Sequence, residues 1–270
     1  EQVRTRAMAL VGGSIALSFA LSLVIAAPIY RVMSLSGIFL VLAVLGVFAM
    51  FVTFYILPSN KVEARVEQAS LKEVFFIPEL MRLNFGVLLL HATQVAMFLV
   101  MPHLLVEAGL PLTEHWKIYL SVVLLSFLMM APILILGEKR QRLRPVFLIA
   151  IIFLVIAELL FSQASSIIFI ALSLLIYFIG FNLLEALLPS LVSRFSNQSK
   201  GTALGIFNTT QSIGLFFGAA VGGYLIDALG DMAVFKISAA LLLCWLIIAW
   251  FMGELPAKVV DSKNAAEVKT

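Results

Sequence analysis

The stretch "KGTALGIFNTTQSIGLFFGAAVG" at residues 200–222 decides the class of fold, because a cation opens it and no further charge follows before Asp227. A helix rises 1.5 Å per residue, so this run is long enough to cross a hydrocarbon core of about 30 Å. The whole chain of 270 residues has the same character, with 62% hydrophobic and 12% charged residues. A soluble domain has about 45–50% apolar and about 25% charged residues. The sequence therefore predicts an all-α integral membrane protein.

Eight apolar segments are long enough to be transmembrane helices. They cover residues 7–30, 36–57, 84–106, 117–136, 145–162, 166–193, 202–227 and 233–253. If the N-terminus is cytoplasmic, 15 Lys and Arg residues fall on the cytoplasmic side and only Arg31, Lys117 and Lys236 on the other. Since cytoplasmic loops carry an excess of Lys and Arg, we expect a multi-pass protein with both termini of this chain in the cytoplasm.

A weak internal repeat links the first and seventh segments. Residues 6–28, "RAMALVGGSIALSFALSLVIAAP", align without a gap with residues 200–222, at an offset of 194 residues. Arg6 meets Lys200, and small residues follow in both segments. The offset equals six spans of about 32 residues, which predicts two six-helix halves. The first segment would then be the fifth helix of its half, so we expect four N-terminal helices of the same parent chain to be missing.

A long polar connection between the second and third segments predicts a boundary. Within it, Ser70 is followed three residues later by Glu73, a capping-box pattern that starts a short amphipathic helix along the inner membrane face. The predicted division is 1–57 for the last two helices of the N-terminal half, 58–83 for a cytoplasmic linker, 84–254 for the C-terminal six-helix half and 255–270 for a cytoplasmic tail.

The loop "GEKRQRLRP" at 137–145 is tight and basic. One interpretation is a positive-inside anchor. The other is a conformational latch in which Glu138 pairs with neighbouring cations or a helix end. Glu138, Lys139 and Arg142 are the candidate gating residues, and both interpretations stay open.

The two-half plan, the linker before the seventh helix and "GEKRQR", a degenerate acidic-basic-x-x-basic motif, resemble the major facilitator superfamily. The resemblance is greater still to the bacterial YajR-type transporters of the drug:proton antiporter branch, over most of residues 1–255. The stretches that carry it are "LNFGVLLLHATQ" (83–94), "EAGLPLTEHWKIYL" (107–120), "FNLLEALLPSL" (181–191) and "KGTALGIFNTTQSIG" (200–214).

The resemblance implies a major-facilitator-type helical bundle, of which this chain holds helices five to twelve. It also implies a location in the bacterial inner (plasma) membrane. The implied function is transport of a small molecule by alternating access, as proton-coupled efflux. The antiporter motif of the fifth helix is reduced to "AAPIYR" (26–31), with Ala27 in place of a glycine. The alternative is a truncated, transport-inactive membrane protein that acts at most as a scaffold or interaction partner.

Polar residues recur at similar depths in three apolar segments. Glu185 lies nine residues from Arg194, and His91 lies nine from Arg82, which places both about 13 Å into the membrane. Asn208 is at a similar depth, and Gln94, Asn182 and Gln211 each lie one turn further in.

This coincidence predicts a functional site. An acidic group at a helix centre costs about 2.5–3.5 kcal/mol to insert, so it should face a cavity or a partner. Loss of water favours proton uptake by a carboxylate, and histidine titrates near neutrality. We therefore expect Glu185 and His91 to couple protons, and the amides to line the substrate cavity. Helix packing is the alternative role for the amides, for His91 and for Glu185. The amides are Gln94, Asn182, Asn208 and Gln211.

The remaining features are expected to be structural. Gly214, Gly218 and Gly222 form a ridge of small residues that lets another helix approach closely. Glu158 is four residues from the outer end of its segment and is expected to be partly solvated.

The single cysteine, Cys244, is expected to be a small buried hydrophobe. With no metal-ligand set, phosphate loop or nucleophile–base pair, we predict no cofactor, no metal and no enzymatic activity. The expected partners are the lipid bilayer, protons and a small-molecule substrate that the sequence does not identify, and no nucleic acid.

Overall fold

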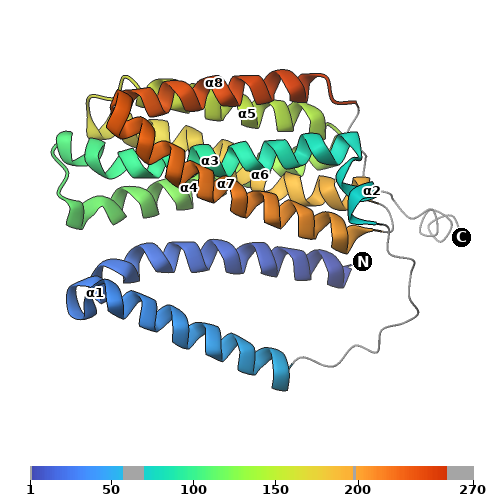
Figure 1. Ribbon diagram of the computed structural model, residues 1–270, viewed down its shortest axis with the longest axis horizontal. Coiled ribbons are helices and arrows are strands. Elements are labelled where there is room, and N and C mark those ends of the chain that lie inside the picture. The colour runs from blue at the N-terminus through green and yellow to red at the C-terminus, as the bar shows by residue number, and fades with distance from the viewer. Residues whose placement is uncertain (1, 57–69, 197–198, 254–270) are drawn as a thin grey trace, which may run out of the picture.

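The computed structural model describes residues 2–56, 70–196 and 199–253, and the long elements in these ranges are all α-helices (Figure 1). The first element, α1 (Gln2–Tyr55), is two helices joined at Ser34, whose φ of 59° and ψ of −168° are not helical. The two parts fold back on each other as a hairpin (Figure 1). They correspond to the predicted spans 7–30 and 36–57, of which residue 57 lies outside the described residues.

Six further long helices match the other six predicted spans. A short helix, α2, and a short 3₁₀ turn, η1 (Leu112–Glu114), lie between some of them. The helices are α2 (Leu71–Phe75), α3 (Pro78–Glu107), α4 (His115–Lys139), α5 (Leu143–Phe161), α6 (Ile167–Phe195), α7 (Lys200–Leu229) and α8 (Asp231–Trp250). Within the described residues, seven helical segments are long and apolar enough to cross a membrane. The chain is therefore a multi-pass membrane protein with an all-α fold.

The short connections make consecutive long helices run in opposite directions, which gives the bundle two ends. At the basic end, α4 ends at Lys139 and α7 begins at Lys200. At the far end, α3 ends at Glu107 and α8 begins at Asp231. The predicted orientation puts the basic end in the cytoplasm.

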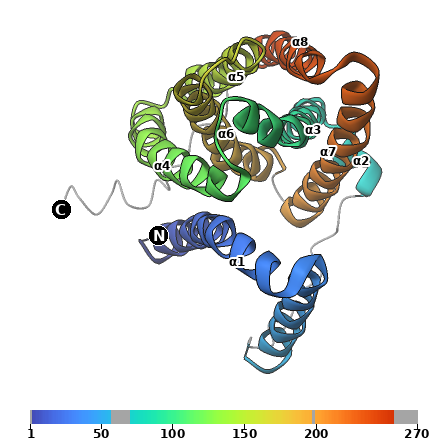
Figure 2. The ribbon, with the colours of Figure 1, turned by 90° about the vertical axis from the view of Figure 1, so that its left-hand side faces the viewer.

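Helices α3 and α6 lie at the centre of the six-helix bundle, with α4, α5, α8 and α7 around them (Figure 2). The hairpin α1 lies on the side of α4 and α7 (Figure 2). At the basic end, the backbone N–H of Ser70 donates to Glu73 Oε2 at 3.2 Å, so α2 begins where the capping-box pattern predicts. Linker residues 58–69 and the tail 255–270 lie outside the described residues.

The predicted glycine ridge is confirmed as a packing surface between α3 and α7. Gly214 lies against the backbone of Leu88, and Gly218 lies against the backbone of Ala92. One turn further, Gly222 faces Ala96. Contacts at every fourth residue on both helices describe two parallel helices in close approach, which larger side chains would prevent.

The prediction for Cys244 is wrong, because this side chain is exposed. Helix α8 buries a stripe that includes Val234, Leu242 and Trp245 against the bundle, and Cys244 lies off that stripe. In an apolar helix the outward face is also apolar, so residue type alone does not tell the two faces apart.

Candidate functional site

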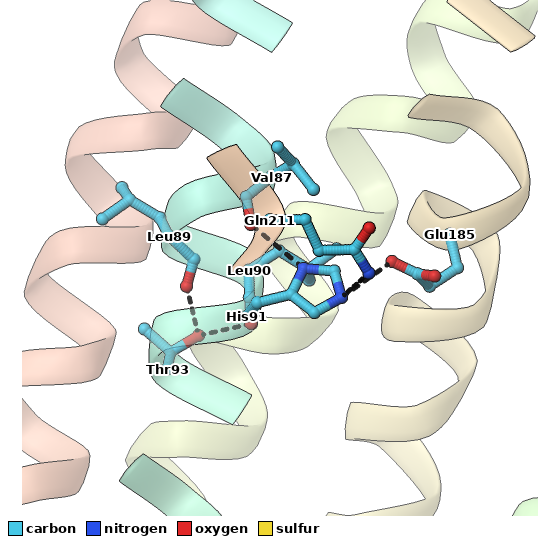
Figure 3. A network of polar contacts seen from close by, with 7 residues as sticks. All are labelled: Val87, Leu89, Leu90, His91, Thr93, Glu185 and Gln211. Carbon is cyan, nitrogen blue, oxygen red and sulfur yellow. Dashed lines mark hydrogen bonds and ion pairs between the residues drawn. The ribbon is translucent and has the colours of Figure 1, made fainter. Parts of the chain in front are cut away.

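Two neighbouring helices bring Glu185 and Gln211 into direct contact with His91 of a third (Figure 3). His91 Nε2, from α3, lies 3.3 Å from Glu185 Oε1 of α6 and 2.7 Å from Gln211 Nε2 of α7. The contact agrees with the common depth predicted for His91 and Glu185, and Gln211, predicted one turn further in, also reaches His91. Each of the three helices contributes one polar side chain to the contact.

The imidazole of His91 is held in a fixed orientation. Its Nδ1 lies 3.0 Å from the carbonyl oxygen of Val87, one turn earlier on α3. A carbonyl oxygen only accepts, so Nδ1 carries a hydrogen and Nε2 is the atom that faces Glu185 and Gln211. The ring of Phe181 meets the imidazole edge-on at a centroid distance of 5.8 Å. This packing leaves His91 only 4% exposed.

His91 Nε2 and Glu185 Oε1 can hold one proton between them. When Nε2 is protonated, it can donate to Glu185 Oε1; when the proton is on Glu185, the acid can donate to Nε2 instead. Gln211 suits both cases, because its amide offers an oxygen acceptor and a nitrogen donor. The Glu185 side chain is 36% exposed, against 5% for His91, so the carboxyl group is the open side of the pair.

Two of the other amides do not join this contact. Asn182 is 9% exposed, and its Nδ2 donates to Ser126 Oγ of α4 at 2.9 Å. Ser126 in turn donates to the carbonyl of Val123 at 2.7 Å. Of the two roles weighed for Asn182, this geometry favours packing between α4 and α6. Asn208 is exposed on α7.

Gln94 lies half-buried on α3, one turn beyond His91 toward the far end. Its assignment to the substrate cavity stays a prediction, as does that of Asn208. Among the described residues, no group of three His, Cys, Asp or Glu side chains is placed to hold a metal ion.

At the basic end, Glu138 pairs with a helix-end cation. Its Oε1 lies 3.4 Å from Arg194 Nη2, which joins the end of α4 to the last turn of α6. The expected pairing of Glu138 is thus present. Lys139 closes α4, and Arg142 directly precedes α5. The role of these residues in gating stays a prediction.

The prediction for Glu158 is wrong, because its side chain is 0% exposed rather than partly solvated. Glu158 lies on the face of α5 that also buries Leu154 and Phe161, and this face points into the bundle. The sequence reasoning also missed Ser126. A lone hydroxyl in the otherwise apolar middle of α4 was the available signal.

The comparisons with known proteins agree with this architecture. The family model of the Major Facilitator Superfamily matches residues 1–218 and 142–269. The chain is 33% identical over 263 residues to the inner membrane transport protein YajR of Escherichia coli K12, which covers 95% of this chain and 58% of YajR. It is 30% identical over 231 residues to an uncharacterised transporter of Buchnera aphidicola from Acyrthosiphon pisum, covering 81% of this chain and 58% of the relative.

Proposed function

Because the chain belongs to the Major Facilitator Superfamily, we propose that it is part of a secondary active transporter that exports a small molecule in exchange for protons. The chain spans 58% of the length of YajR, so transport by the whole protein is itself part of the proposal. YajR is described as an inner membrane protein, and the same bacterial location is proposed here, with both ends of this chain cytoplasmic.

One observation carries the proposal of proton coupling: His91 contacts both Glu185 and Gln211 at the junction of three helices. An ionisable pair within membrane helices is costly to keep and typically marks an ion or proton pathway. Proton uptake at this point changes the charge of the pair. The attraction between α3 and α6 then changes with it, so occupancy by a proton can bias which arrangement of the helices is stable.

In this mechanism the Glu185 carboxyl group is the proton acceptor, because it is the more exposed member of the pair. His91 holds the carboxyl group in place while its own Nδ1 stays bonded to Val87. A change in the protonation of His91 also affects α7 through Gln211. The Gln211 amide must present its oxygen to a protonated imidazole ring and its nitrogen to an unprotonated one. A substrate that competes for the Gln211 amide would thereby be coupled to the proton.

Glu138 and Arg194 extend the proposal to gating at the basic end. Their ion pair joins α4 to α6 in the arrangement seen here. An opening movement that separates these two helix ends would break it, so the pair would stabilise one state of the alternating-access cycle over the other.

The test is transport in proteoliposomes made with the full-length gene product, screened against lipophilic cations and small metabolites. We expect an imposed pH gradient to drive uptake by the unmodified protein. Glu185→Gln should lose the gradient-driven component and keep exchange of the same compound without a gradient. Glu114→Gln is the matched control, because Glu114 lies at the far end beside Lys117, 3.1 Å away. Equal gradient-driven transport by the unmodified protein and Glu185→Gln would disprove the assignment.

A further inference from the structure

Glu158 is a buried acid that the mechanism above does not use. Its side chain is 0% exposed on α5, and neither carboxyl oxygen has a hydrogen-bond partner among the described residues. An ionised carboxylate in such a place would lack both water and a counter-charge, which costs several kcal/mol or more. A neutral acid needs only one acceptor for its hydrogen and is far less costly there.

The hydroxyl group of Tyr177 is a second buried polar group near Glu158. Tyr177 of α6 is 0% exposed, and its hydroxyl also lacks a hydrogen-bond partner among the described residues. Phe161 lies three residues from Glu158 on the same face of α5, and its ring centroid is 6.1 Å from that of Tyr177. The carboxyl group of Glu158 and the hydroxyl group of Tyr177 are within electrostatic reach of each other.

A second hydroxyl group, that of Thr93 on α3, lies near Tyr177. Its Oγ1 donates to the carbonyl oxygens of Leu89 and Leu90 at 2.9 Å and 3.2 Å. The hydroxyl hydrogen of Thr93 is therefore used in these bonds, while the lone pairs of Oγ1 can still accept a hydrogen bond from Tyr177. Thr93 is two residues from His91 (Figure 3). Glu158, Tyr177 and Thr93 are thus buried polar side chains contributed by three helices.

The face of α6 connects this set to the site described above. Tyr177, Phe181 and Glu185 follow one another at four-residue spacing, so they lie along one side of the helix. The rings of Tyr177 and Phe181 are stacked at 6.1 Å, and Phe181 contacts His91. Tyr177 is two turns, about 12 Å, nearer to the far end than Glu185 is.

The charged residues named below, on the helices packed against α5, have partners other than Glu158 or are exposed. Glu185 pairs with His91 and Asp231 with His103, while Lys236 of α8 is exposed. On α4, Glu138 pairs with Arg194 of α6, and Lys117 pairs with Glu114. Tyr177 is the titratable group of α6 that lies within electrostatic reach of Glu158.

We propose that Glu158 and Tyr177 form a second proton-binding site, on the far-end side of the Glu185–His91 pair, in which Glu158 takes up and releases a proton. The proton comes from water and returns to water, so no other reactant is needed. The role of this site in transport rests on the proposed function, whereas proton binding by Glu158 does not.

The test is infrared difference spectroscopy of the full-length gene product in liposomes, stepped between about pH 9 and about pH 5 in H₂O and in D₂O, with the proton as the only probe. We expect a carboxylic acid C=O band that shifts in D₂O. Glu158→Gln should lose this band, and Glu185→Gln should retain it. Tyr177→Phe should shift its frequency, because it removes a hydroxyl group whose dipole acts on the acid. Glutamine has the shape of the neutral acid, so Glu158→Gln should fold.

Identical spectra for the unmodified protein and Glu158→Gln would overturn the proposal. A Glu158 band that responds to neither pH nor D₂O would also overturn it, because the acid would then be a locked structural group. Should Glu158→Gln fail to fold, Tyr177→Phe decides alone, and an unshifted band overturns the proposal. If the Glu158 band is present but a pH gradient drives no transport, only the proposed function fails. If transport is proton-driven and the band is absent, only this inference fails.

Discussion

Replacing Gly218 with alanine tests the close approach of α3 and α7. A methyl group at this position would lie 2.8 Å from Ala92 Cα and 3.0 Å from the Ala92 carbonyl carbon, and against the Ala92 oxygen as well. Carbon atoms in contact are normally about 3.5–4.0 Å apart. The obstacle is backbone rather than a flexible side chain, so no change of rotamer relieves it. The two helices would have to separate by about 0.7 Å at this point.

The cost of this overlap follows from measurements on overpacked cores, which lose about 1–3 kcal/mol. For a chain of this size, 1 kcal/mol corresponds to about 2–4 °C in melting temperature. Alanine also favours the helix over glycine by up to about 1 kcal/mol, and that gain must be measured separately. Gly223→Ala measures this gain in helix propensity alone, because nothing lies within 4 Å of a methyl group at Gly223 on the same helix.

We therefore expect Gly218→Ala to melt about 2–12 °C below Gly223→Ala in detergent, with unfolding followed by fluorescence-detected gel filtration after heating. The comparison between the two alanine variants removes the contribution of helix propensity. Equal melting temperatures would refute the reasoning, because α7 could then take a methyl group on either face at the same cost.

Two further predictions concern polar contacts between helices. Ser126→Ala removes the acceptor of the buried Asn182 amide and should lower the free energy of unfolding by about 0.6 kcal/mol, up to about 1.7. Asn182→Leu should then lower the melting temperature less in the Ser126→Ala background than alone. Additive losses in melting temperature would contradict the contact. His103 Nδ1 lies 2.5 Å from Asp231 Oδ2, and the ion pair exists only with the ring protonated. Asp231→Asn should therefore lower the melting temperature at about pH 5 but not at about pH 9, and an equal loss at both would contradict the ion pair.

The positions of the helices could be predicted because charge and hydropathy mark where each one enters and leaves the membrane. Arg82, Arg194 and Lys200 mark one edge of the apolar segments. Counting residues from that edge gives depth at 1.5 Å per residue, and this count alone assigns Glu185 and His91 to one level of the membrane. Their contact in the folded chain agrees with that shared depth.

The direction in which each side chain faces could not be predicted as well. Asn182 and Gln211 were expected at similar depths, but one bonds to α4 while the other bonds to His91. In a soluble helix the polar face marks the outside, whereas a helix that is apolar all round carries no such mark. Glu158 shows the same difficulty, because its distance from the helix end suggested access to water while its face of α5 points inward.

The glycine ridge and the polar site are parts of one arrangement. Gly214 lies one turn from Gln211 on α7, and its close contact with Leu88 brings α7 near enough for the Gln211 amide to reach His91 at 2.7 Å. A separation of about 0.7 Å at the ridge would weaken that hydrogen bond, because it would take the distance beyond the usual range of about 2.7–3.2 Å. Small residues on α7 are thus a condition for the contact that links three helices. Changes to the ridge should therefore alter the proton-coupling site without touching any of its polar groups.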